Sequence, residues 1–223
     1  MDVGVVAVIG AGTMGAGIAQ VCAQSGWETR LFDAFPDGLD KGMAAIYGFW
    51  DKGIERGKTT VAQKAEWSAN LSQHSEMAEA VAGADLVIEA VPERAQLKYE
   101  LFETLDRAVS PDTILASNTS SISITRLASR TDRPEKFMGF HFMNPVPVMQ
   151  LVELIRGIAT DQATFDLLHE VVRTLGKTAA SAEDFPAFIV NRILMPMINE
   201  AVYTLYEGVG NVTSIDKAMK LGT

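Results

Sequence analysis

Cysteine and histidine are scarce in this sequence of 223 residues. One cysteine, Cys22, excludes a disulfide within the chain and fits a reducing compartment, so we expect a cytoplasmic protein. The three histidines, His74, His141 and His169, are too scattered to predict a metal site. No lysine or arginine precedes the first apolar run and Gly10 cuts that run short, which argues against a secretory signal.

Basic residues are outnumbered, since 19 lysines and arginines stand against 28 acidic residues and the formal net charge is −9. This balance argues against a nucleic-acid-binding surface and against a general attraction to anionic membranes. The apolar stretch Phe188–Leu205 is interrupted by Arg192, Pro196 and Glu200, so it predicts a buried or interface helix instead of a membrane span. We therefore expect neither nucleic acid nor a membrane as a partner.

Strand-like and helix-like segments alternate in the first half of the chain. The expected strands are Val3–Ile9, Glu28–Phe32, Leu86–Val91 and Thr113–Ala116. The expected helices are Thr13–Ser25, Pro36–Arg56 and Ala95–Val109. This alternation is typical of parallel βαβ units and predicts the α/β class, with a Rossmann-type, doubly wound, mostly parallel sheet.

The pattern changes after Lys136. We expect two strands around an Asn-Pro turn, then a helix and a short last strand: Phe137–Phe142, Leu151–Ile155, Thr164–Leu175 and Lys177–Ser181. After Pro186 the sequence is helical throughout. We therefore divide the chain into a dinucleotide-binding domain, residues 1–186, and the start of an all-helical second domain, residues 187–223.

A glycine-rich motif joins the first expected strand to the first expected helix. Its six residues, G-x-G-x-x-G, are Gly10, Ala11, Gly12, Thr13, Met14 and Gly15. In this pattern the first glycine permits a tight turn, the second lets the backbone approach a pyrophosphate, and the third allows close packing of helix on strand. Asp33, at the end of the next strand, would bind a ribose and repel a 2′-phosphate, so NAD is favoured over NADP. FAD and S-adenosylmethionine sites share this pattern.

Polar side chains interrupt apolar segments at two further places. The run Ser117 to Ser121, which contains Asn118 and Ser120, follows an expected strand at its carboxyl end, where ligands of such sheets bind. It is also compatible with a simple turn before a helix cap. His141 and Glu153 lie in two strands joined by a short turn, so they are able to pair, with the carboxylate fixing the imidazole tautomer.

Together these stretches resemble the L-3-hydroxyacyl-CoA dehydrogenase family, most closely its bacterial 3-hydroxybutyryl-CoA dehydrogenase members. The matching segments are Val8–Gln20, Ala116–Ile122, Gly139–Val148 and Phe188–Arg192. The resemblance covers the whole chain and implies NAD as cofactor and an acyl-CoA as substrate. Ala187 stands where the family usually has glycine, a difference that could shift the start of the second-domain helix.

The resemblance also implies roles for individual residues. His141 matches the catalytic base, Glu153 its paired carboxylate, Ser120 the serine that binds the substrate's C3 oxygen, and Asn191 an asparagine that reaches the site from the second domain. The cofactor-contacting positions would be Asp33, Glu93, Lys98, Asn118 and Asn144, beside the glycine motif. Lys52 and Arg56 would bind the phosphates of coenzyme A, although a solvated charged face is the alternative.

The family carries a larger helical second domain, through which a homodimer is expected. We therefore expect a truncated chain that holds all four catalytic side chains and exposes the apolar helix Phe188–Leu205. Two other functions remain open at this point. One is an NAD-binding protein without turnover, and the other is a dehydrogenase of free hydroxy acids or sugar acids on the same scaffold.

Overall fold

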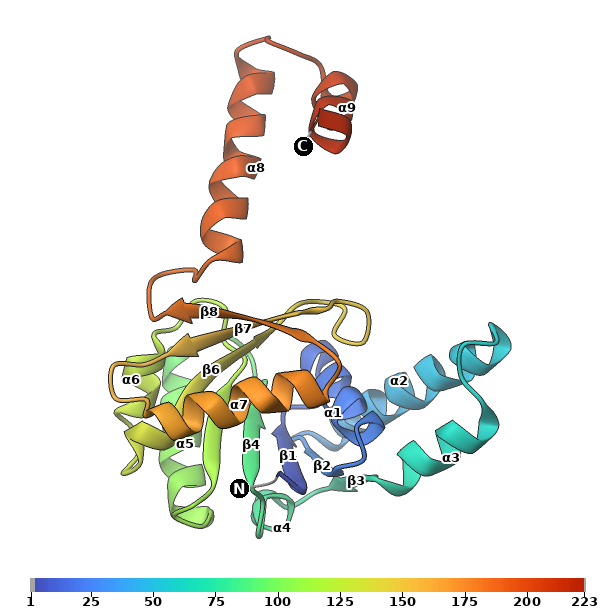
Figure 1. Cartoon of the computed structure of the whole chain (residues 1–223), viewed down its shortest axis with the longest axis vertical. Helices are drawn as coiled ribbons and strands as arrows, with labels where there is room; N and C mark the ends of the chain where they lie inside the picture. Colours follow the sequence, from blue (N-terminus) through green and yellow to red (C-terminus); the bar gives the residue numbers. More distant parts are fainter. Residues whose placement is uncertain (1–2, 223) are drawn as a thin grey trace.

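The computed structural model describes residues 3–222. Its centre is an eight-stranded sheet with the order β3-β2-β1-β4-β5-β6-β7-β8 (Figure 1). Every neighbouring pair is parallel except β6 and β7, which are antiparallel. The strands are β1 (Val5–Ile9), β2 (Glu28–Phe32), β3 (Leu71–His74), β4 (Leu86–Glu89), β5 (Ile114–Ser117), β6 (Phe137–Phe142), β7 (Leu151–Arg156) and β8 (Thr178–Glu183). The predicted α/β class with a mostly parallel, doubly wound sheet is confirmed.

Helices cover both faces of this sheet (Figure 1). They are α1 (Thr13–Gln24), α2 (Pro36–Glu55), α3 (Val61–Ala69), α4 (Met77–Val81), α5 (Ala95–Ala108), α6 (Ile124–Ala128) and α7 (Gln162–Thr174), with a 3-10 turn at Pro134–Lys136. Val6 and Val8 of β1 pack with α1, α2 and α7, while Ala7 and Ile9 pack with α4, α5 and α6. Because alternate side chains of a strand point to opposite faces, burial on both faces explains why β1 is continuously apolar.

Two further helices, α8 (Val190–Tyr206) and α9 (Val212–Gly222), extend away from the sheet (Figure 1). Neither has a buried residue, and large apolar side chains such as Ile193, Val202 and Tyr206 are exposed. Within residues 3–222, no helix combines the length and the apolar character that crossing a membrane requires.

The connection between β8 and α8 is anchored to the sheet domain. Asp184 accepts hydrogen bonds from the Ser123 hydroxyl at 2.7 Å and from the backbone N–H groups of Ile124 and Thr125 at 2.9 and 2.8 Å. The carboxylate thereby satisfies free N–H groups at the start of α6. The base of α8 is thus tied to the edge of the sheet that carries the candidate site.

Candidate active site

The glycine loop between β1 and α1 has the shape that a dinucleotide requires. Gly10 has a φ of +104°, and a Cβ at that position would lie 2.7 Å from the carbonyl oxygen of Ala90. A Cβ on Gly15 would collide with the carbonyl oxygen of Gly10. Gly12, which precedes the first turn of α1, has nothing within 4 Å of its Cβ direction. The loop therefore leaves open space at a helix N-terminus, where N–H groups bind phosphates, and its residues fit NAD.

The acidic residue at the end of β2 is held in a fixed orientation. Asp33 accepts hydrogen bonds from the backbone N–H groups of Ala11 at 2.7 Å and of Phe35 at 2.9 Å. It lines a cavity of about 760 Å³, which we call the outer cleft, together with the glycine loop and the start of α5. A carboxylate at this place is able to accept ribose hydroxyls.

A smaller cavity of about 180 Å³, which we call the inner pocket, adjoins the outer cleft. It is lined by Met14, Ala90, Val91, Glu93, Lys98, Asn118 and Ser120. Met14, Ala90 and Val91 line both cavities, so the two are neighbours. Five residues that were predicted from the sequence to bind the cofactor or to act in catalysis thus surround one pocket at the carboxyl ends of β4 and β5: Met14, Glu93, Lys98, Asn118 and Ser120.

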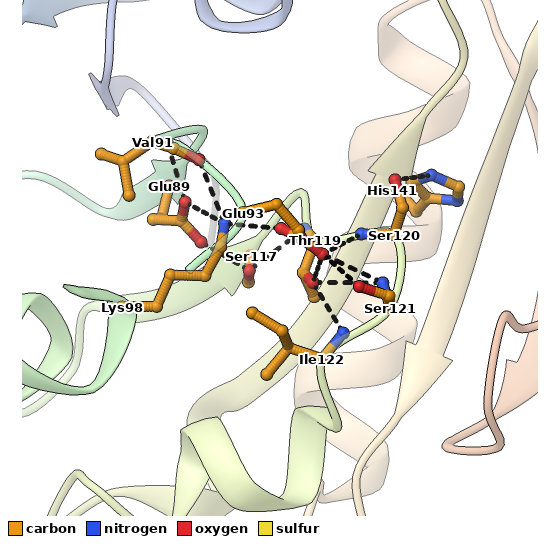
Figure 2. Close-up of polar contacts among 10 residues, drawn as sticks. All are labelled: Glu89, Val91, Glu93, Lys98, Ser117, Thr119, Ser120, Ser121, Ile122 and His141. Atoms are coloured by element: carbon orange, nitrogen blue, oxygen red, sulfur yellow. Dashed lines mark hydrogen bonds and ion pairs between the residues drawn. The ribbon is translucent and has the colours of Figure 1, made fainter. Parts of the chain in front are cut away.

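His141 lies at the centre of a hydrogen-bonded row beside this pocket. The antiparallel register of β6 and β7 sets His141 opposite Glu153, and its Nδ1 lies 2.7 Å from Oε2 of Glu153. Its Nε2 lies 3.0 Å from Oγ of Ser120 (Figure 2). Because an ionised carboxylate only accepts hydrogen bonds, Nδ1 carries the proton and Nε2 keeps a free lone pair. The imidazole is therefore oriented as a base toward Ser120.

Glu153 also reaches the second domain. Its Oε1 accepts hydrogen bonds from the backbone N–H groups of Ile189 at 3.0 Å and Val190 at 2.9 Å, at the start of α8. Burial raises the pKa of Glu153, but the hydrogen bonds from His141 and from these N–H groups outweigh burial, so the pKa lies below its ordinary value. One carboxylate thus joins the imidazole to the base of α8.

The segment before α8 packs directly on the imidazole. The ring of Phe188 meets the ring of His141 edge to face, with 5.6 Å between centroids. Ala187 and Phe188 have φ values of 67° and 52° in the left-handed region, so Ala187 adopts a conformation that favours glycine. Asn191 lies half-buried in the first turn of α8.

The loop that carries Ser120 is shaped by Glu93. Its Oε1 accepts hydrogen bonds from the Thr119 hydroxyl at 2.5 Å, from the Ser120 N–H at 3.0 Å, and from the N–H and hydroxyl of Ser121 at 3.1 and 2.9 Å (Figure 2). Burial raises the pKa of Glu93, but the hydrogen bonds from Thr119 and Ser121 together with Lys98 lower it below its ordinary value. Glu93 is therefore the anionic centre of this loop.

Lys98 is a buried residue, although α5 begins at the surface. Its side chain is 1% exposed, and its Nζ lies 2.5 Å from Oε1 of Glu89 and 3.2 Å from Oε2 of Glu93. Glu89 is fully buried and also accepts hydrogen bonds from the Ser117 hydroxyl and the Val91 N–H. Glu89 was not predicted as a site residue, but an acidic residue inside the apolar strand β4 was a signal that could have found it.

Asn118 and Asn144 approach the cavities from two loops. Asn118 accepts a hydrogen bond from the Phe142 N–H at 2.8 Å, which ties the ends of β5 and β6 together. Asn144 precedes a cis proline and lines a third cavity of about 540 Å³ between α1, α2 and this loop. Lys177 holds the loop by donating to the carbonyl oxygens of Val146 and Met149, both at 2.7 Å.

Lys52 and Arg56 are not brought to the catalytic row. Both are exposed at the C-terminal end of α2, and neither lines the three cavities. The third cavity instead includes Lys41, which the sequence analysis did not single out. Lys41 precedes Lys52 by three turns of α2, or about 16 Å along the helix axis.

Comparison with known proteins agrees with this geometry. The sequence matches the 3-hydroxyacyl-CoA dehydrogenase NAD binding domain over residues 5–185 and the C-terminal domain of that family over residues 188–223. It is 55% identical over 217 residues to the 3-hydroxybutyryl-CoA dehydrogenase of Bradyrhizobium diazoefficiens, covering 97% of this chain and 74% of that protein. Human mitochondrial hydroxyacyl-coenzyme A dehydrogenase is 43% identical over 231 residues, covering 97% of this chain and 71% of the human protein.

Solved structures give the same result. The crystal structure of (S)-3-hydroxybutyryl-CoA dehydrogenase from Ralstonia eutropha superimposes with a TM-score of 0.95 at 43% identity, covering 99% of this chain and 78% of that one. The 3-hydroxybutyryl-CoA dehydrogenase of Escherichia coli has the same TM-score at 40% identity, covering 99% of this chain and 46% of that one. The chain therefore belongs to the 3-hydroxyacyl-CoA dehydrogenase family, and its N-terminal part is the NAD-binding domain of that family.

Proposed function

We propose that this protein transfers a hydride between NAD and the C3 carbon of a 3-hydroxyacyl-CoA, with 3-hydroxybutyryl-CoA and acetoacetyl-CoA as its substrate pair. The observation that carries the proposal is the row Ser120, His141 and Glu153, with distances of 3.0 and 2.7 Å, beside a pocket that adjoins the outer cleft. Relatives named 3-hydroxybutyryl-CoA dehydrogenase at 55% and 44% identity support the choice of substrate.

Four side chains divide the chemistry among them. In the oxidative direction, Nε2 of His141 accepts the proton of the substrate's C3 hydroxyl, and Glu153 stabilises the positive charge that the imidazole gains. The Ser120 hydroxyl donates a hydrogen bond to the C3 oxygen, and Asn191 contacts the same oxygen from the first turn of α8. In the reductive direction His141 returns the proton. Because Nε2 already faces Ser120 at 3.0 Å, little reorganisation is needed.

The cofactor would be held by three parts of the site. The N–H groups of the loop from Gly10 to Gly15 bind the pyrophosphate, and Asp33 binds the adenosine ribose. Glu93, Lys98 and Asn118 line the inner pocket, which would receive the nicotinamide ring because it adjoins Ser120 and His141. Asn144 would contact the cofactor from the loop beside the third cavity. When bound, the cofactor supplies the acceptor or the donor of the hydride.

Coenzyme A is polyanionic, and its phosphates need cations in a chain whose net charge is −9. We assign Lys52 and Arg56 to the phosphates, because both are exposed on the end of α2. Lys41, which belongs to the same helix α2, lines the third cavity.

We assign the helical segment, residues 187–223, to a second domain that would form the surface between two copies of the protein. We place the domain boundary near Pro186, with residues 1–186 binding the dinucleotide and residues 187–223 forming the helical part. The exposed apolar side chains of α8 and α9, such as Met195 at 58% and Leu221 at 85%, support a homodimer formed through this part. A cytoplasmic location is supported by the single cysteine, Cys22, which is buried.

The test is an absorbance assay of NADH oxidation with acetoacetyl-CoA and with free acetoacetate, and of NAD⁺ reduction with a panel of sugar acids. We expect turnover of the CoA ester and a kcat/KM at least about 100-fold lower for the free acid. The free acid lacks the coenzyme A part of the substrate, whose contacts with the protein would otherwise lower the free energy of the transition state. NADH binding without turnover of any compound would favour a binding protein. Equal turnover of ester and free acid would favour a dehydrogenase of free acids.

A further inference from the structure

The ammonium group of Lys98 is enclosed between two carboxylates at the edge of the inner pocket. It lies 2.5 Å from Oε1 of Glu89 on its inner side and 3.2 Å from Oε2 of Glu93 on its outer side (Figure 2). The side chains of Lys98 and Glu89 are 1% and 0% exposed, whereas that of Glu93 is 38% exposed. A buried pair of this kind is weakly screened by solvent, so its charges act on whatever occupies the pocket.

The hydrogen bonds at Glu89 are those of a carboxylate. Oε1 accepts from Nζ of Lys98 and from the Val91 N–H at 2.7 Å, and Oε2 accepts from the Ser117 hydroxyl at 2.6 Å. Burial raises the pKa of Glu89 above its ordinary value, although these three donors act against burial. An ammonium and a backbone N–H cannot accept a hydrogen bond, so Oε1 has no partner for a proton of its own. Oγ of Ser117 already accepts from the Thr119 N–H at 3.2 Å and directs its own proton to Oε2. The geometry therefore favours an ionised Glu89 beside Lys98.

The charge of the cluster follows from its members. Two carboxylates and one ammonium leave one net negative charge, and the other residues lining the inner pocket are uncharged. Without the carboxylate of Glu89, the charges of Lys98 and Glu93 would cancel. The two redox forms of a nicotinamide differ by one unit of charge on the ring, which is positive when oxidised and neutral when reduced. A net negative pocket therefore favours the oxidised form.

We propose that Glu89 sets the relative affinity of the site for oxidised and reduced nicotinamide, by neutralising Lys98 and leaving the inner pocket with the negative charge of Glu93. The proposal rests on the proposed function, which puts the nicotinamide ring in the inner pocket. Glu89 does not line the inner pocket and would act on the ring only by neutralising the charge of Lys98.

The test compares the dissociation constants of NAD⁺ and NADH, measured by titration calorimetry, for the wild type and Glu89→Gln. We expect NAD⁺ affinity to fall relative to NADH affinity by at least about tenfold, the effect of removing one charge several ångströms away at an effective dielectric constant of about 20. ADP-ribose lacks the ring and should show no such selective change. General damage to the cleft would weaken both cofactors and ADP-ribose alike, so the affinity ratio isolates the charge.

Two further variants keep the test decisive. Glu89→Gln with Lys98→Met removes both members of a buried pair, which is better tolerated than removing one, and it leaves Glu93 as the only charge of the cluster. The NAD⁺ to NADH affinity ratio of this double variant should stay within about twofold of the wild type. Asp106→Asn is the matched control, because Asp106 is a mostly buried carboxylate paired with Arg133 at 2.6 Å and lies outside the three cavities.

Two results would overturn the proposal. One is an unchanged affinity ratio in Glu89→Gln, which would mean that Glu89 carries no charge. The other is a ratio that rises in favour of NAD⁺ in the double variant, which would mean that Lys98 is not neutralised in the wild type. Either result with normal turnover of acetoacetyl-CoA by the wild type refutes this inference alone. Binding of both cofactors by a wild type without turnover refutes the proposed function alone.

Discussion

The substitution Glu153→Gln separates the two contacts that this carboxylate makes. Oε2 receives the proton-bearing Nδ1 of His141, and Oε1 receives the backbone N–H groups of Ile189 and Val190. A glutamine has one acceptor oxygen and one NH₂ group for these two sides. Backbone N–H groups always donate, whereas the imidazole is able to change its tautomer. We therefore expect the glutamine oxygen to stay with the backbone and its NH₂ group to face Nδ1 of His141.

This orientation would disable the base. An NH₂ group at Nδ1 requires Nδ1 to accept, so the proton moves to Nε2, the atom that should take the proton of the substrate. Loss of general base catalysis lowers kcat by about 10²–10⁴-fold. Because the backbone contacts at Ile189 and Val190 persist, the free energy of unfolding should fall by only about 1–3 kcal/mol.

The measurements are kcat from NAD⁺ reduction with 3-hydroxybutyryl-CoA, the direction in which His141 acts as the base, and the free energy of unfolding from urea titration. Glu66→Gln, at an exposed position on α3, is the control and should change neither quantity. A Glu153→Gln variant whose kcat stays within about threefold of the wild type would refute the assignment of the tautomer to Glu153.

Three further predictions follow from other parts of the molecule. Lys52→Glu combined with Arg56→Glu should raise the KM for acetoacetyl-CoA by at least about tenfold, because two negative side chains would then repel the phosphates of coenzyme A. The Kd of NADH should not change, and an unchanged KM would exclude phosphate binding at these two residues. Ala187→Gly should raise the free energy of unfolding, measured in urea, by about 0.5–1 kcal/mol. The strain that glycine removes at a φ of 67° is larger than the cost of the extra backbone entropy that glycine loses on folding. A lower free energy of unfolding in the variant would show that Ala187 is unstrained. The pKa values of Glu153 and Asp184 lie below their ordinary values of 4.5 and 3.8, so their stabilisation is complete above those values and is lost as pH falls through the folded-state pKa. Acid titration followed by circular dichroism should therefore show stability falling below about pH 4.5, less steeply in Asp184→Asn, and parallel curves would contradict the assignment.

Much of the sheet was predictable because its strands are buried on both faces. β1 and the first three residues of β4 are apolar runs, and β6 is apolar apart from His141. The expected boundaries of all three strands differ from the observed ones by two residues or fewer. The region from residue 57 to 82 received no prediction, although it forms α3, β3 and α4. β3 is four residues long, reads Leu-Ser-Gln-His, and lies at the edge of the sheet, so its apolar signal is weak.

Contacts in the site were predictable where the two partners lie close together in the sequence. The pairing of His141 with Glu153 follows from two strands joined by a short turn, and the antiparallel register indeed sets these residues opposite each other. The contact of Glu153 with the start of α8 was not predictable, because it joins residues 36 and 37 positions apart through a linker with unusual backbone angles. The same holds for Glu89, whose partners Lys98 and Ser117 come from different elements.

The proposed identity of the base is tested most directly by acetoacetyl-CoA reduction in His141→Ala beside the wild type, with NADH binding measured in both. We expect turnover by the wild type, a kcat lower by about 10²–10⁴-fold in the variant, and an unchanged Kd for NADH. A variant that reduces acetoacetyl-CoA at the wild-type rate would contradict the central claim, because His141 would then not be the group that moves the proton.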